Sequence, residues 1–216
     1  MQLIRPFYPR CFALSFSITA LLFSSVAFAG GQIYIPLSAS VRTAMQQSIS
    51  DQAPLRLAFA TQGEADFWLK TMSDRLKQYL PDVKTRTNFL KTVHYEATRA
   101  GLDPQLVLAL IEVESSFNKY AVSRSGARGY MQVMPFWVRE IGVKGHDLFH
   151  LNVNLRYGCT ILRYYLDLEK GNLFRALGRY NGTLGQPEYP NQILAAWRNH
   201  WSFATQTFST RHTPPS

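Results

Sequence analysis

The stretch IEVESSFNKYAVSRSGARGYMQVMP, residues 111–135, joins the end of an apolar segment to a loop rich in serine and glycine. Asp103-Pro104 opens this segment with a capping residue followed by proline at the first helical position. Nearly every residue between that start and the quoted stretch is apolar, which predicts a central, buried helix. Two carboxylates, Glu112 and Glu114, stand at its end, where a charge is costly.

The two glutamates are separated by two positions, which is about 200° around a helix, so they face opposite ways and do not act as a pair. Glu114 lies in the last turn, at the negative end of the helix dipole, and its apolar surroundings should raise its pKa further. A carboxylic acid that stays protonated near neutral pH suits general-acid catalysis on a glycosidic oxygen. Glu112 is expected to be a solvated or salt-bridged neighbour.

Apolar residues recur at helical spacing through most of the remaining chain, and alternating patterns are few. Helices are expected over residues 41–50, 64–80, 82–101, 135–141, 155–170, 173–180 and 189–201. Asp82 is a candidate N-cap, and Arg156 and Arg163 are expected to point outward. The predicted fold is an all-α domain, with at most a short β-hairpin in the loop after the central helix.

The first 29 residues have the pattern of a secretory signal peptide. Arg5 and Arg10 are their only charges, and an apolar segment follows that ends in small-x-small at Ala29. Cleavage there would make Gly30 the first mature residue. An uncleaved membrane anchor is the alternative, because an apolar segment of about 18 residues just suffices to span a bilayer. The serine and threonine residues in the segment favour cleavage.

Composition and charge restrict the class of protein. The chain has 216 residues, of which 46% are hydrophobic, which excludes a disordered chain and allows one sizeable domain. Loss of Arg5 and Arg10 takes the net charge from +9 to +7. A basic exported protein suits an anionic polymer or a membrane surface, and nucleic acid is disfavoured because no basic run interleaves with aromatic residues.

Cysteine and histidine give no sign of a disulfide or a metal site. Without the signal peptide only Cys159 remains, so an internal disulfide is excluded, and a buried, inert thiol is expected. His146 and His150 are spaced to share a helical face, but no further ligand stands at a supporting spacing. We therefore expect surface polar residues there and no metal.

Three ordered blocks of residues carry a family resemblance. The first comprises Glu114-Ser115, Phe117-Asn118, Ala121-x-Ser123, Gly126-Ala127-x-Gly129, Met131-Gln132 and Met134-Pro135. The second is Asn154-Leu155-x-x-Gly158, and the third is Ala176-Leu177-x-x-Tyr180-Asn181. Together they resemble the soluble lytic transglycosylase family, whose fold is lysozyme-like. The departures are Tyr130 for leucine, Lys119 for proline and Gly182-Thr183 for Ala-Gly.

The resemblance implies a peptidoglycan lytic transglycosylase without a cofactor. In that family one glutamate, here Glu114, protonates the oxygen between N-acetylmuramic acid and N-acetylglucosamine. It then takes a proton from the muramic acid C6 hydroxyl, which closes a 1,6-anhydro ring. The candidate substrate-binding residues are Ser123, Gln132, Met134, Tyr180 and Asn181.

Each candidate also has a purely structural reading. Ser123 and Gln132 could tie their loop to itself, and Tyr180 could belong to the core. The tryptophans Trp137, Trp197 and Trp201 are also better read as core than as platforms for sugar rings.

Two other functions stay open. A hydrolytic muramidase of the same fold would usually need a second carboxylate, for which Asp167, Glu169 and Glu188 are the downstream candidates. A non-catalytic peptidoglycan-binding protein would be expected to lack the glutamate.

The resemblance also suggests how the chain is organised and where it acts. The expected parts are a signal peptide at 1–29, a segment of unknown role at 30–63, the catalytic domain at 64–205 and a disordered tail at 206–216. We expect a periplasmic monomer, or a membrane-anchored one if the signal stays uncleaved. Its expected partner is the glycan strand of peptidoglycan, and envelope proteins are candidates for further partners.

Overall fold

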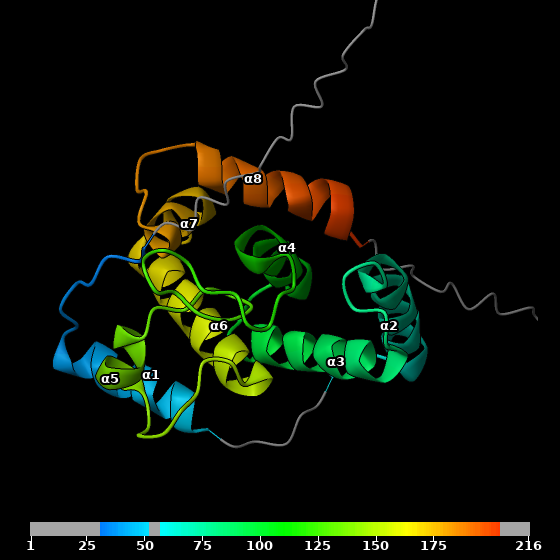
Figure 1. Ribbon diagram of the computed structural model, residues 1–216, viewed down its shortest axis with the longest axis horizontal. Coiled ribbons are helices and arrows are strands. Elements are labelled where there is room, and N and C mark those ends of the chain that lie inside the picture. The colour runs from blue at the N-terminus through cyan, green and yellow to red at the C-terminus, as the bar shows by residue number, and fades with distance from the viewer. Residues whose placement is uncertain (1–30, 52–56, 204–216) are drawn as a thin grey trace, which may run out of the picture.

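The computed structural model describes residues 31–51 and 57–203, and within them the chain is helical (Figure 1). The elements are α1 (Ala39–Ser50), α2 (Gln62–Leu76), α3 (Val83–Arg99), α4 (Pro104–Ser115), α5 (Phe136–Ile141), α6 (Leu151–Leu168), α7 (Leu173–Asn181), α8 (Glu188–Ala196) and the π-helical turn η1 (Trp197–Trp201). In these residues β-structure is limited to two isolated bridges, Val122 with Arg128 and Arg128 with Val133. The all-α prediction is confirmed; the predicted signal peptide and tail lie outside the described residues.

Helix α4 is the centre of the domain. The Asp103 carboxylate accepts hydrogen bonds from the backbone N–H groups of Gln105 (2.6 Å) and Leu106 (3.3 Å), which caps the start of the helix as the sequence indicates. Residues 106–111 are all buried. Figure 1 shows α4 surrounded by the other helices, and it contacts α3, α8 and η1. Across the described residues, no helix combines the length and apolarity that crossing a membrane requires.

Helix α1 packs against α5 and α6, and its buried Met45 and Ile49 join the same core as α4. Helix α6 carries one departure from the prediction, because Arg156 turns inward. Its Nη2 lies 2.9 Å from Oε1 of Glu96 on α3, and only 2% of the Glu96 side chain is exposed. A buried carboxylate requires such a partner, which is why amphipathic spacing mispredicts this arginine.

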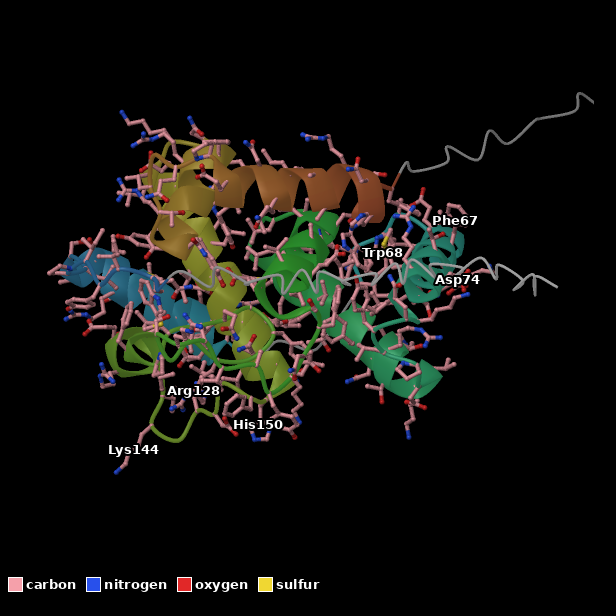
Figure 2. All side chains as sticks on the ribbon, turned by 45° about the horizontal axis from the view of Figure 1, so that its top comes forward. Phe67, Trp68, Asp74, Arg128, Lys144 and His150 are labelled. Carbon is pink, nitrogen blue, oxygen red and sulfur yellow. The ribbon has the colours of Figure 1, made fainter. Side chains whose placement is uncertain are left out.

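Helix α2 ends at Leu76, four residues before the predicted end. The backbone N–H groups of Tyr79 and Leu80 both donate to the Leu76 carbonyl, so the chain turns off the helix axis before Pro81. Figure 2 shows Phe67 and Trp68 on α2. Trp68 is buried against Phe59 and His94, whereas Phe67 contacts Phe203 near the end of the described chain.

The predicted last helix is divided into α8 and η1. The π-helical turn makes a wider spiral, which places His200 and Trp201 side by side on Glu112 of α4. These two contacts attach the C-terminal end of the described chain to the central helix.

Candidate active site

Glu114 is a buried carboxyl at the C-terminal end of α4. Only 7% of the residue is exposed, although it is an ionisable residue at the end of a helix. Burial raises its pKa to about 8, and a hydrogen bond from Tyr189 acts in the opposite direction. The carboxyl therefore keeps its proton near neutral pH, as expected from its apolar surroundings.

Tyr189 on α8 is the direct partner of Glu114. Its hydroxyl donates a 2.6 Å hydrogen bond to Glu114 Oε1 across 75 residues of sequence. Burial and the nearby Glu114 raise the pKa of Tyr189 well above its usual value, so the tyrosine remains a donor. Tyr189 could not be identified from the sequence, because no local pattern indicates which face of the last helix meets α4.

Glu112 occupies a different environment on the opposite face of α4. It accepts hydrogen bonds from the Tyr79 hydroxyl (3.0 Å) and the Trp201 indole N–H (2.6 Å), and it lies 2.9 Å from His200 Nδ1. The expected opposite orientation of the two glutamates is thus present, and Glu112 is a hydrogen-bonded neighbour of Glu114 on the other face of the helix. Its role is to join α4 to the segments on either side.

The chain leaves α4 through two non-glycine residues in the left-handed region. Ser116 has φ 48° and Phe117 has φ 61°, a conformation that costs a non-glycine residue on the order of 1–2 kcal/mol. Phe117 is buried and packs on Tyr79 and Trp201, with ring centroids 4.7 and 5.4 Å away. This packing holds the strained turn, which reverses the chain directly after Glu114.

The three sequence blocks meet at Met131. Asn154 of α6 accepts a 2.8 Å hydrogen bond from the Met131 N–H, and the Tyr180 hydroxyl of α7 donates a 2.7 Å bond to the Met131 carbonyl. Gly158 is required by the same contact, since a Cβ there would lie 2.3 Å from the Met131 sulfur. Residues that are far apart in sequence therefore fasten the loop beside the end of α4.

The predicted substrate-binding residues surround this loop. Gln132 is buried and donates to the carbonyls of Ala121 (3.1 Å) and Gly129 (2.9 Å), while the Ser123 hydroxyl accepts from the Ala127 N–H (3.0 Å). These bonds tie the loop to itself, as the structural readings anticipated.

The other three candidates lie nearby. Met134 is half-buried, whereas Asn181 and Tyr180 are buried at the end of α7. The Tyr180 hydroxyl bonds to the loop and not to Glu114, yet the Glu114 charge contributes, after burial, to raising the pKa of Tyr180. A role of any of these five residues in binding sugar stays a prediction.

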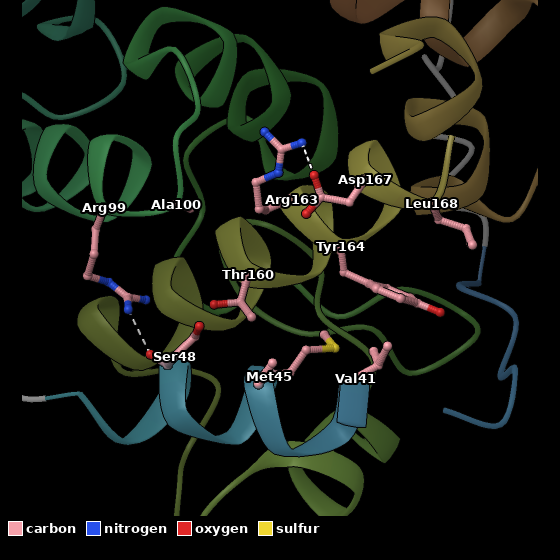
Figure 3. Close-up of a pocket in the computed structure, with 11 residues that line it drawn as sticks. Val41, Met45, Ser48, Arg99, Ala100, Thr160, Arg163, Tyr164, Asp167 and Leu168 are labelled. Carbon is pink, nitrogen blue, oxygen red and sulfur yellow. Dashed lines mark hydrogen bonds and ion pairs between the residues drawn. The ribbon is translucent and has the colours of Figure 1, made fainter. Parts of the chain in front are cut away.

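The other acids considered for a second carboxylate lie in different surroundings. Asp167 pairs with Arg163 on α6, above a pocket of about 410 Å³ between α1 and α6 (Figure 3). Glu169 pairs with Arg175 and Arg179. Glu188 is exposed in the first turn of α8. Within the described chain, Glu114 accepts its hydrogen bond from Tyr189 and is not hydrogen-bonded to any of these three acids.

The two histidines are placed separately. His146 Nδ1 lies 2.9 Å from the Tyr157 hydroxyl, and His150 Nε2 lies 3.6 Å from Asp147. Among the residues that the structure describes, no group of three or more histidine, cysteine, aspartate or glutamate side chains is arranged to hold a metal ion. Cys159 is buried, as expected, and burial raises its pKa.

Fold and site together define an all-α domain built around one buried, protonated carboxyl at the end of a central helix. Residues 91–192 match the family model of the transglycosylase SLT domain. This part of the chain is thus similar to an SLT domain.

Two curated relatives and one solved structure illustrate the similarity. Membrane-bound lytic murein transglycosylase C of Actinobacillus pleuropneumoniae serotype 5b is 46% identical over 75 residues, which is 35% of this chain and 16% of that protein. The transglycosylase of Enterobacteria phage PRD1 is 32% identical over 111 residues, which is 48% of this chain and 41% of that protein. An inactive variant of lytic transglycosylase Slt from Pseudomonas aeruginosa is 20% identical with a TM-score of 0.40, covering 76% of this chain and 32% of that one. The chain thus spans well under half the length of these proteins.

Proposed function

We propose that this protein is a peptidoglycan lytic transglycosylase that cleaves the β-1,4 bond between N-acetylmuramic acid and N-acetylglucosamine. The observation that carries the proposal is the buried Glu114 carboxyl, with its pKa raised to about 8, at the end of the central helix of an SLT domain. A group of this kind can donate a proton at neutral pH, which an exposed glutamate cannot do efficiently.

The proposed reaction uses one carboxyl twice. The Glu114 carboxyl donates its proton to the glycosidic oxygen as the bond from that oxygen to the muramic acid C1 breaks. The resulting carboxylate accepts the proton of the muramic acid C6 hydroxyl, whose oxygen forms the new bond to C1. The product carries a 1,6-anhydro ring, Glu114 is protonated again, and the reaction needs no water and no cofactor.

Tyr189 serves this cycle by positioning the carboxyl. Its hydroxyl holds Glu114 Oε1 at 2.6 Å, which leaves the second carboxyl oxygen to carry the proton. The same hydrogen bond stabilises the carboxylate that forms between the two proton transfers, so it lowers the pKa that burial has raised.

The surroundings of the remaining acids favour this route over hydrolysis. A muramidase usually positions a second carboxylate to assist water or to act as nucleophile. Asp167 on α6 and Glu169, the residue that follows the end of α6, are both paired with arginines. The presence of Glu114 itself argues against a protein that only binds peptidoglycan.

The substrate determines where the protein acts. Peptidoglycan lies outside the cytoplasmic membrane, and the signal-peptide pattern of residues 1–29 would deliver the chain to the periplasm. We propose a chain that begins at Gly30 after cleavage.

Digestion of purified sacculi tests the proposal. The wild-type chain should release muropeptides with anhydro ends, which mass spectrometry detects because each is lighter than its reducing counterpart by one water. Glu114→Gln should release almost none. Products with reducing ends alone would identify a muramidase, and binding of glycan strands without turnover would identify a non-catalytic protein.

A further inference from the structure

The first described residues, Gly31 to Leu37, form an extended segment that runs from the surface beside the end of α7 to the start of α1 (Figure 1). We call this segment the N-terminal strap. Its last residue, Leu37, is buried in the core, whereas Ile33, Tyr34 and Ile35 are 42–61% exposed. Leu37 thus anchors the end that leads into α1, and in the middle of the strap the Tyr34 ring contacts Phe136 with ring centroids 5.5 Å apart.

Gln32 is the exception, because its side chain is directed inward. The residue is only 5% exposed, and its Oε1 accepts a 2.7 Å hydrogen bond from the Trp137 indole N–H. The backbone N–H of Met134 approaches the same oxygen at 3.4 Å. Two donors thus converge on the carbonyl oxygen of a carboxamide. An N-acetyl group on a sugar presents the same carbonyl oxygen and an adjacent N–H.

The strap lies against the predicted substrate-binding residues. A Cβ built on Gly31 would be 3.2 Å from the Cβ of Ser125, whose hydroxyl is hydrogen-bonded to Ser123. Met134 bonds to Gln32 directly. On the opposite side the strap touches Gly182, which directly follows Asn181.

Gly182, the C-cap residue of α7, packs directly against the strap. A Cβ on Gly182 would lie only 2.2 Å from the carbonyl oxygen of Gly31. The residue also has φ +81°, which glycine adopts without strain. The absence of a side chain at Gly182 thus leaves room for the strap at its contact with α7.

We propose that the N-terminal strap is a displaceable cover of the substrate-binding surface, in which the Gln32 carboxamide occupies the place of a substrate N-acetyl group. Glycan then binds only after the strap has moved away, and its N-acetyl group takes over the Trp137 and Met134 donors. Opening breaks the Gln32 hydrogen bonds and the Tyr34–Phe136 contact, and within the strap only the side chains of Gln32 and Leu37 are buried. This inference rests on the proposed function for the nature of the ligand.

A disulfide that holds the strap closed provides the test. Gly31→Cys with Ser125→Cys should form a bond, since their Cβ atoms would lie 3.2 Å apart and must separate only slightly to reach the usual 3.5–4.5 Å. The variant is made in the chain beginning at Gly30, where the native Cys159 is buried and does not compete. The probe is an oligomer of N-acetylglucosamine, and its binding is measured calorimetrically with Glu114→Gln included to prevent turnover. The oxidised form should bind at least about tenfold more weakly than the reduced form.

Gln32→Ala supplies a second measurement without a cross-link. Removing the acceptor of both hydrogen bonds, of which the one from Met134 is long at 3.4 Å, should loosen the closed strap and tighten binding of the same oligomer about fivefold or more. Ile35→Ala is the matched control on the strap, because its side chain is exposed, and should leave the affinity unchanged.

Equal affinity of the oxidised and reduced forms, failure of the disulfide to form, or no binding by either form would overturn the proposal. A different outcome separates the two proposals. If binding depends on the disulfide but the reduced form with Glu114 intact releases no muropeptides, the strap proposal stands and the proposed enzymatic activity is refuted.

Discussion

The hydroxyl of Tyr189 donates a 2.6 Å hydrogen bond to Oε1 of Glu114, and both residues are buried. The bond partly opposes the effect of burial, which raises the pKa of Glu114 to about 8. A general acid works best when its pKa lies near the operating pH, because the group must be protonated and must also release its proton. Tyr189 thus sets where on the pH scale Glu114 can act.

Replacement of Glu114 by glutamine should abolish most of the turnover. The amide keeps the shape and can still accept the Tyr189 hydrogen bond, but it has no proton to donate. We expect the rate of muropeptide release to fall by roughly 10²–10⁴-fold or more. Glu112→Gln is the control: it should lose stability, as hydrogen bonds to a charged group weaken, while keeping most of its rate. If Glu112→Gln lost its activity while Glu114→Gln kept it, the assignment of Glu114 as the catalytic residue would be wrong.

Replacement of Tyr189 by phenylalanine should raise the pKa of Glu114. The hydrogen bond stabilises the carboxylate, so its loss favours the protonated form. The alkaline limb of the profile of kcat/KM against pH should therefore move to higher pH than in the wild type. A limb that stays in place while the rate falls would mean that Tyr189 acts only in packing.

Stability should depend on pH through Glu114 with a definite sign. The pKa rises from 4.5, the ordinary value, to about 8 in the folded chain, so the folded state binds more protons than the unfolded state between these two values. The free energy of unfolding therefore falls as pH rises through this window, at a total cost of about 1.4 kcal/mol for each unit of the shift.

Glu114→Gln removes this dependence, because the amide does not titrate. The midpoint temperature of the variant should exceed that of the wild type at pH 8 to 9 and approach it near pH 4. A constant difference between the two proteins over the whole range would contradict the raised pKa.

A pair of glycine substitutions should separate backbone strain from steric fit in the loop. Gly126 (φ +87°) and Gly129 (φ +73°) are both in the left-handed region, where alanine costs on the order of 1–2 kcal/mol. A Cβ on Gly126 meets no atom within 4 Å, whereas one on Gly129 would lie 2.4 Å from Asn154 Nδ2. Gly129→Ala should thus lower the free energy of unfolding by about 1–3 kcal/mol more than Gly126→Ala, measured by urea denaturation. The same Cβ would lie 2.5 Å from the Leu148 backbone carbonyl oxygen, so equal losses would show that both Asn154 and this carbonyl move aside freely.

The starts of α3 and α4 were predictable from the sequence because capping is local, whereas α6, which has no side-chain cap, begins at Leu151, four residues before the predicted start. Asp82 accepts from the Thr85 N–H at 2.7 Å, and Asp103 caps α4 as expected. Helix ends were predicted less well, as at α2, where the chain leaves the helix at Leu76 and not at the proline. A turn that depends on where the next helix packs leaves no local signature.

The candidate site divides in the same way. The sequence by itself determined that Glu114 closes an apolar helix, which suffices to predict burial and a raised pKa because both follow from neighbours along the chain. Only the tertiary structure decided that Tyr189 is its partner, that Glu112 is bound by Trp201, and that Gln32 lies over the loop. These contacts join residues 75, 89 and 102–105 positions apart. Their pairing depends on how whole helices pack, and the periodicity of any one helix does not contain that information.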